Sequence, residues 1–320
     1  MPQSKTTLAA FTASRKAIDK FVTASMRQGR TWGEESVTER LLMAAYPTVR
    51  YVEFNRAQEE VVGADWLWWF VDRSGEAFGA LVQAKKLKVQ AQSCAIDFKH
   101  PGGDAAGKQM RNLLTTAEFL DVPAVYALYC GTLKYREEVT ECPVHEYRGR
   151  PCQRCQRASI MMLSALAAQE LAYLSPASAG SSTFETGVPL EDLVDPEVCA
   201  DSFPFDAPLA VELATFFEQK QEGVRDIAKA MFNSVKKARQ LLMATPEDLG
   251  DDTVFGTIPA GLGQFEPDKL PFRHILRGLK RELPRDVADA IESGGQLGLW
   301  EYRRFIAGVV VVDVDATESE

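Results

Sequence analysis

The sequence predicts a mixed α/β fold in which helices flank a mixed sheet, and three observations lead to this prediction. Between residues 30 and 175 the hydrophobic patterns follow the order helix, strand, strand, strand, helix, strand. Two β-prone segments, residues 63–70 and 77–85, enclose the turn candidate Asp72-Arg73-Ser74-Gly75, which predicts a hairpin. Residues 124–130 are nearly all apolar, as is typical of a strand buried on both faces.

The other elements follow from helical periodicity and from residues that start or stop helices. Residues 8–29 have the spacing of an amphipathic helix. Thr31-x-x-Glu34 fits a capping box at the start of a second helix, which Pro47 ends. The patterns further predict a strand at 49–55, helices at 105–120 and 159–174, a linker or loop at 175–187, mainly helical structure to about 243, and a strand at 308–314.

We therefore expect three parts. Residues 1–29 form an N-terminal helix, residues 30–175 form the α/β core with a cysteine-rich loop, and residues 176–320 form a mainly helical C-terminal region.

The bulk composition favours a cytoplasmic protein without a membrane segment. The 320 residues carry a net charge of −9 and no apolar run near the roughly 20 residues that cross a bilayer. The N-terminus lacks the apolar block of a signal peptide. The negative charge argues against a protein that coats nucleic acid through bulk charge. The sequence has only three histidines, which makes a catalytic triad or a multi-histidine metal site a poor expectation. An enzyme would therefore depend on carboxylates and lysine.

Two clusters of basic residues fit a solvated face and a nucleic-acid surface about equally well. They consist of Arg148, Arg150, Arg154 and Arg157, and of Arg273, Arg277, Lys280, Arg281 and Arg285.

The hairpin is expected to bring three polar groups to one end of an apolar sheet. A turn centred on residues 73–74 gives paired residues a constant sum of 147, which sets Asp65 opposite Val82 and beside Gln83. Because side chains alternate across a strand, Gln83 and Lys85 share a face. A converging carboxylate, amide oxygen and ammonium suit chemistry with a metal ion and a water nucleophile. The simpler alternatives are a strand cap for Asp65, a polar sheet edge for Gln83 and an exposed strand end for Lys85.

The cysteine-rich loop predicts a zinc site. Cys142-x-x-His145 and Cys152-x-x-Cys155 are two ligand pairs, and tetrahedral Zn²⁺ prefers thiolate and imidazole ligands. If all four side chains bind, the site is closed and structural. A disulfide, which a reducing cytosol disfavours, and unpaired thiols are the alternatives, and Cys130 is an alternative ligand to His145.

The element order, with Asp65 on the second strand and Gln83-x-Lys85 on the third, resembles the PD-(D/E)XK nuclease superfamily. The likeness is closest to Mrr-type restriction endonucleases, in which Gln replaces the second acid, and it covers about residues 31 to 130. Ala64 replaces the proline of the motif name, a departure that the family tolerates. Glu35, with apolar residues at +2, +6 and +7, resembles the glutamate of the family's first helix.

The resemblance implies a restriction-endonuclease-like core that hydrolyses phosphodiester bonds, first of all those of DNA. Asp65 would bind a divalent metal, Gln83 would offer its amide oxygen, and Glu35 would complete the metal shell. Lys85 would orient or deprotonate the attacking water, or stabilise charge that develops on the phosphoryl group. Gln109 resembles a glutamine often found near this site. Hard oxygen ligands suit Mg²⁺ or Mn²⁺.

The resemblance alone also implies a role in restriction or another anti-phage defence. Because paired cuts by such nucleases often require dimers, it is compatible with a homo-oligomer. The main rival is a catalytically inactive nuclease fold whose zinc knuckle binds nucleic acid or a protein. A second rival is an enzyme of another class that uses the zinc.

Overall fold

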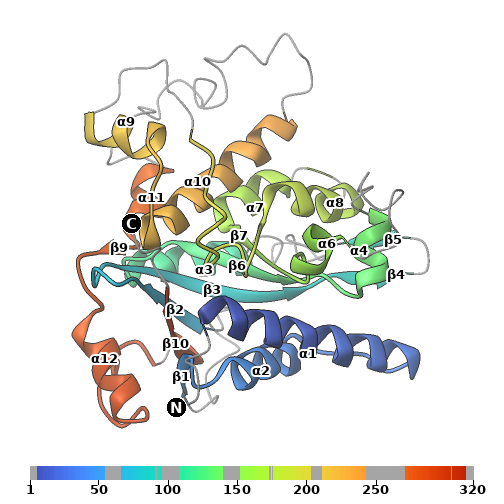
Figure 1. The fold of residues 1–320 in the computed structure, drawn as a ribbon, viewed down its shortest axis with the longest axis horizontal. Coiled ribbons are helices and arrows are strands. Elements are labelled where there is room, and N and C mark those ends of the chain that lie inside the picture. The colour runs from blue at the N-terminus through green and yellow to red at the C-terminus, as the bar shows by residue number, and fades with distance from the viewer. Residues whose placement is uncertain are drawn as a thin grey trace.

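A mixed sheet lies between two layers of helices in the computed structural model of the chain (Figure 1). The structure describes residues 6–54, 66–90, 93–95, 108–139, 152–172, 174, 176–202, 211–242, 271–303 and 305–314. Helices α1 and α2 cover one face of the sheet, and α3, α7, α8 and α10 lie on the other (Figure 1). The mixed α/β prediction is therefore confirmed.

The main sheet has eight strands within these residues, in the order β1-β10-β2-β3-β6-β7-β8, with β9 paired to β3. A separate hairpin, β4–β5, follows β3. The strands are β1 (Val49–Glu53), β2 (Trp66–Val71), β3 (Ala77–Lys86), β4 (Lys88–Gln90), β5 (Ser93–Ala95), β6 (Ala124–Tyr129), β7 (Ile160–Ser164), β8 (Val188–Pro189), β9 (Leu279–Lys280) and β10 (Gly308–Asp313).

The described helices include a long first helix, as expected, and a long α10 that packs across the sheet's second face. They are α1 (Thr7–Arg27), α2 (Glu34–Ala45), α3 (Lys108–Phe119), α4 (Leu133–Val139), α6 (Gln153–Arg157), α7 (Ala165–Leu171), α8 (Pro176–Thr186), α9 (Val211–Glu218), α10 (Gly223–Leu242), α11 (Phe272–Leu276) and α12 (Arg285–Glu292). No helix in the described ranges is long and apolar enough to cross a membrane.

The predicted hairpin forms, but its register differs by one from the prediction. Trp66 pairs with Val82, so paired residues have a sum of 148 and not 147. The Trp69 indole explains why Gly79 stands opposite it, because a Cβ at Gly79 would lie 2.7 Å from ring atoms of Trp69. The close packing of this ring fixes the register from within the sheet.

Strand β10, from the C-terminal part of the chain, lies between two strands from the N-terminal part. It pairs antiparallel with β1 and parallel with β2, and the run Val309–Val312 is fully buried. A strand with neighbours on both sides and helices over both faces favours this β-branched sequence. The C-terminal part of the chain thus supplies a strand between the first two strands of the predicted core.

Three local predictions were wrong. The N-cap residue of α2 is Gly33 and not Thr31, and the N-cap makes no side-chain capping hydrogen bond. The predicted helix at 159–174 begins as strand β7, because a short apolar run reads equally well as either element. The predicted linker at 175–187 contains α8, whose Ala-rich and Ser-rich composition tolerates a helix that packs against α10.

A buried ion network ties α1 to α4 and α6. The Arg136 side chain is fully buried and donates to the Asp19 carboxylate at 3.0 and 3.1 Å. It also donates to the carbonyls of Gly131 at 2.6 Å and Cys155 at 2.7 Å. A buried guanidinium needs such partners to offset its loss of hydration.

A second set of buried ion pairs removes Arg157 from the predicted basic surface. Its guanidinium lies 2.6 Å from both the Asp192 and Asp195 carboxylates and 3.7 Å from that of Glu191. Glu191 also pairs with Arg15 of α1. Arg157 therefore serves the interior packing and is not a contact for nucleic acid.

His274 is a buried acceptor that holds the start of β6. Its Nε2 atom accepts a hydrogen bond from the Ala124 N–H at 3.1 Å, which requires a neutral imidazole. Burial, assisted by the nearby Arg277 charge, lowers the pKa of His274 to about 4.

We expect His274 to lower the unfolding free energy of the protein as the pH decreases. Between pH 6.5 and about 4 the unfolded chain binds a proton at this residue more readily than the native chain does, so the unfolding free energy decreases there by up to about 3 kcal/mol. His274→Gln retains an acceptor but does not titrate. Urea unfolding at several pH values should show that the unfolding free energy of the parent protein falls relative to that of the variant as the pH decreases through that window.

Parallel stability curves for the two proteins would contradict this role. The Asp226 carboxyl, whose pKa burial raises to about 6, gives an opposite slope in the same range. It is present in both proteins and therefore cancels from their difference.

Candidate functional site

Gln83 and Lys85 lie at the end of β3 on the face of the sheet that α3 covers. Within the described residues β2 accompanies β3 only from Ala77 to Val82, whereas β6 accompanies it from Leu81 to Lys86. The two side chains therefore stand where β3 continues beyond its last described pairing with β2. Alternation places Lys86 on the opposite face, where its Nζ atom donates to the Trp32 carbonyl at 2.8 Å, next to the start of α2.

Gln83 has an amide oxygen that no described group satisfies. The residue is 2% exposed, and its Oε1 atom is buried with no hydrogen-bond partner. Its neighbour across the parallel pairing is Tyr126, a buried residue whose pKa burial raises above its usual value. An unsatisfied buried carbonyl of this kind costs about 1–3 kcal/mol. Such an atom is a ready ligand for a cation.

Lys85 is held by Gln109. Its Nζ atom donates to the Gln109 Oε1 atom at 2.6 Å, and Gln109 lies in the first turn of α3, the helix that connects β3 to β6. The structure thus brings together two of the residues that the resemblance assigns to the site. The hydrogen bond to this amide helps to fix the position of the ammonium.

Of the two acids in the first turn of α2, Glu34 is the one whose described contact reaches β3. Its Oε1 atom accepts a hydrogen bond from the Lys86 backbone N–H at 2.8 Å. Glu35, the predicted site residue, is exposed in the same turn. Sequence reasoning missed Glu34 because it interpreted this residue as the partner of Thr31 in a capping box.

A signal for Glu34 was present in the helical spacing. Thr38 lies four residues after Glu34 and therefore on the same side of α2. Thr38 is buried, and its hydroxyl lies 2.6 Å from that of Tyr129 at the end of β6. The side of α2 that faces the strand ends thus carries Glu34.

Asp65 lies outside the described residues, directly before Trp66 in the sequence. The described part of the site therefore consists of an amide oxygen without a described partner and a positioned ammonium on the α3 face of β3, while the Glu34 carboxylate binds the backbone at the end of the strand from the side of α2. The amide oxygen can ligate a hard cation, and the ammonium can serve as a proton donor or an electrostatic stabiliser.

The predicted zinc ligands are described only in part, since Cys142 and His145 lie outside the described residues. Cys152 stands at the N-cap of α6 and Cys155 lies three residues later, so both side chains share one side of that turn. Both are buried. The alternative ligand Cys130 is buried too, and burial raises the pKa of its thiol to about 12, which disfavours a thiolate.

We expect the purified protein to contain about one zinc ion per chain by plasma mass spectrometry. Cys152→Ser combined with Cys155→Ser should remove it and lower the melting temperature, because a structural metal contributes to folding. Cys199→Ser is the matched control, since this exposed cysteine lies outside the loop. Zinc retained by the double variant, or absent from the parent protein, would dismiss the site.

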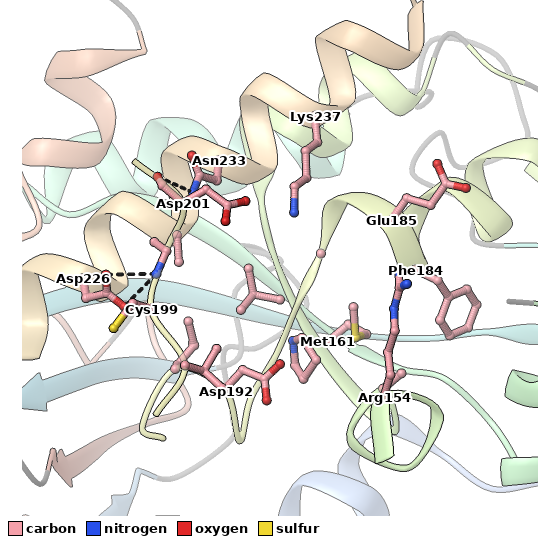
Figure 2. Close-up of a pocket in the computed structure, with 18 residues that line it drawn as sticks. Arg154, Met161, Phe184, Glu185, Asp192, Cys199, Asp201, Asp226, Asn233 and Lys237 are labelled. Atoms are coloured by element: carbon pink, nitrogen blue, oxygen red, sulfur yellow. Dashed lines mark hydrogen bonds between the residues drawn. The ribbon is translucent and has the colours of Figure 1, made fainter. Parts of the chain in front are cut away.

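A separate cavity of about 400 Å³ lies away from these residues (Figure 2). None of its lining residues belongs to β2, β3 or α3. It is therefore not the space in which Gln83 and Lys85 would act.

Comparison with known proteins gives a match to a family model. A model of a family of unknown function, DUF6615, matches residues 6–314. No curated protein matches the chain, and no solved structure matches it. Because the match spans nearly the whole sequence, the chain belongs to the DUF6615 family.

Proposed function

We propose that the protein is a metal-dependent nuclease that hydrolyses phosphodiester bonds of DNA, built on a restriction-endonuclease-like core. The observation that carries the proposal is the buried Gln83 oxygen, which has no partner among the described residues, two residues from a lysine that Gln109 holds in place. The order α2, β1, β2, β3, α3, β6 and the parallel pairing of β3 with β6 also support it. A role in restriction or anti-phage defence rests on the resemblance alone.

The described donor set fits a hard divalent cation. The Gln83 oxygen lacks a partner in the described part of the chain, and a cation would satisfy it. Asp65, by its position in the sequence, is the acid that would share the ion, and Glu35, as the resemblance implies, would add charge. Mg²⁺ or Mn²⁺, when bound, supplies Lewis-acid stabilisation of the phosphoryl oxygens.

Lys85 is the residue of the chain that would act on the reacting atoms. With its ammonium fixed by Gln109, it can orient the attacking water or stabilise the charge that develops on the phosphoryl group. Glu34 holds the end of the same strand through the Lys86 N–H and would thereby position Lys85. We therefore assign Glu34 a positioning role, and Glu35 keeps the role in the metal shell that the resemblance implies.

Lys85→Met should lower Mg²⁺-dependent cleavage of plasmid or linear DNA by at least about 100-fold, because it removes the charge and retains the length of the side chain. Asp65→Asn should do the same. Lys134→Met, at an exposed lysine in α4, is the matched control and should cleave normally. Unchanged thermal unfolding of all three would show that the fold is intact.

Cleavage that survives both Lys85→Met and Asp65→Asn would remove the proposed site. No cleavage by the parent protein with either Mg²⁺ or Mn²⁺, on single-stranded and double-stranded substrates, would favour the inactive nuclease fold that binds a partner.

Gln83 makes a distinct prediction about metal affinity. An amide adds no charge, so we expect Mg²⁺ to bind weakly to the protein alone and more tightly when DNA phosphates contribute negative oxygens. Gln83→Glu should tighten binding without DNA by about tenfold, measured by calorimetry. Gln219→Glu, which adds the same charge at an exposed position after α9, should not. Equal affinity with and without DNA would count against this account.

A further inference from the structure

The cavity in Figure 2 is enclosed by α10, by α8, by α6 and by the segment of residues 187–201. Its apolar lining includes Met161 of β7, Phe184 of α8 and Leu193, all of them buried. Charged side chains from separate elements surround this apolar surface, and they include Arg154, Asp201 and Lys237. The cavity thus combines an apolar interior with a charged rim.

One wall of the cavity is fixed by side chains that α10 presents at successive turns. The Asp226 carboxylate accepts from the Ala200 N–H at 3.1 Å. Lys229 donates to the Ser202 hydroxyl at 2.8 Å. The next turn contributes one more bond: the amide nitrogen of Asn233 donates to the Asp201 carbonyl at 3.2 Å. Residues 200–202 are therefore held along the helix, which places Asp201 at the edge of the cavity.

Three charged side chains on the rim have no direct ion-pair partner in the described ranges, although Asp201 also interacts electrostatically with Lys229. Arg154, Lys237 and Asp201 form no ion pair within the described part of the chain, although each lines the cavity. Asp192, which also lines it, differs because Arg157 binds its carboxylate at 2.6 Å. Figure 2 shows Lys237 reaching from α10 toward the cavity, with Asp201 and Arg154 on opposite sides of it.

We propose that this cavity binds a small zwitterion, a molecule with a free ammonium and a free carboxylate joined by an apolar body, such as an amino acid or a short peptide. The carboxylate of the ligand would lie between Arg154 and Lys237, and its ammonium would lie against Asp201. The apolar body would cover Met161 and Phe184. Charges of both signs around an apolar interior match this distribution of charge in the ligand.

The acidic side chains of the cavity argue against a polyanion. Asp201 and Asp226 lie on the wall formed by α10 and residues 200–202, so a ligand with several phosphates would meet carboxylates there. A simple cation would leave Arg154 and Lys237 unmatched. A zwitterion satisfies both signs, and this chemistry is independent of the proposed nuclease site.

Isothermal titration calorimetry of the full chain with trialanine and with leucine tests the proposal, and the two probes distinguish a peptide from an amino acid. At least one should bind, and its N-acetylated and C-amidated forms should each bind at least about tenfold more weakly, because each form lacks one of the two charges. No binding of either probe would overturn the proposal. Equal binding of the capped forms, or binding of AMP or inorganic phosphate in their place, would also overturn it.

Variants link the binding to the named side chains. Asp201→Asn and Lys237→Met should each weaken the bound probe at least about fivefold, whereas Lys134→Met, at an exposed lysine in α4, should not. Unchanged affinity in both cavity variants would place the ligand elsewhere. Lys85→Met should leave this binding intact, which separates the test from that of the nuclease.

A second readout uses Cys199, an exposed thiol that lines the cavity. The bound probe should slow alkylation of Cys199, measured by peptide mass spectrometry. An unaffected alkylation rate at saturating probe would contradict binding in this cavity.

Discussion

The arrangement of the candidate site depends on the parallel pairing of β3 with β6, which continues to the last residue of β3. Strand β3 runs from Ala77 to Lys86, and β6 accompanies it from Leu81 to that end. Interior positions of β3 demand apolar or small side chains, since helices cover both faces of the sheet. Polar Gln83 and Lys85 are tolerable only near the end of the strand, where the N-terminus of α3 supplies Gln109. The end of β3 thus accommodates these polar residues and also brings Lys85 into contact with Gln109.

A glutamine at position 83 changes the electrostatics that such a site would have with two acids. A second carboxylate would raise metal affinity, and it would also pair with Lys85 and draw down the positive charge available to a phosphate. The structure has an amide at position 83, and the ammonium of Lys85 donates to the neutral oxygen of Gln109. The unsatisfied Gln83 oxygen stores a desolvation cost that a bound cation would recover. In the proposed nuclease, metal affinity and substrate affinity would therefore reinforce each other.

Sequence reasoning succeeded where local patterns determine structure and failed where distant contacts do. Two β-prone segments around a turn candidate predicted the hairpin, and the alternation of side chains along a strand predicted the shared face of Gln83 and Lys85, because both are local properties. The run Ile160–Ser164 was misread as helix, since a short apolar segment carries no period of its own. The placement of β10 between β1 and β2 could not be predicted, because pairing across more than 200 residues leaves no local trace. The ion pairs of Arg157 likewise depend on acids far along the chain.

Those ion pairs bear on how a nucleic acid would be held. In the first basic cluster Arg157 is sequestered by carboxylates and Arg154 lines the cavity of Figure 2. In the second cluster, Lys280 pairs with Asp121. With a net charge of −9, the protein offers fewer cations to phosphates than the count of arginines suggests. Binding of DNA would therefore depend on a few contacts close to Lys85 and on the metal between protein and phosphate, and the catalytic groups would double as the main source of affinity.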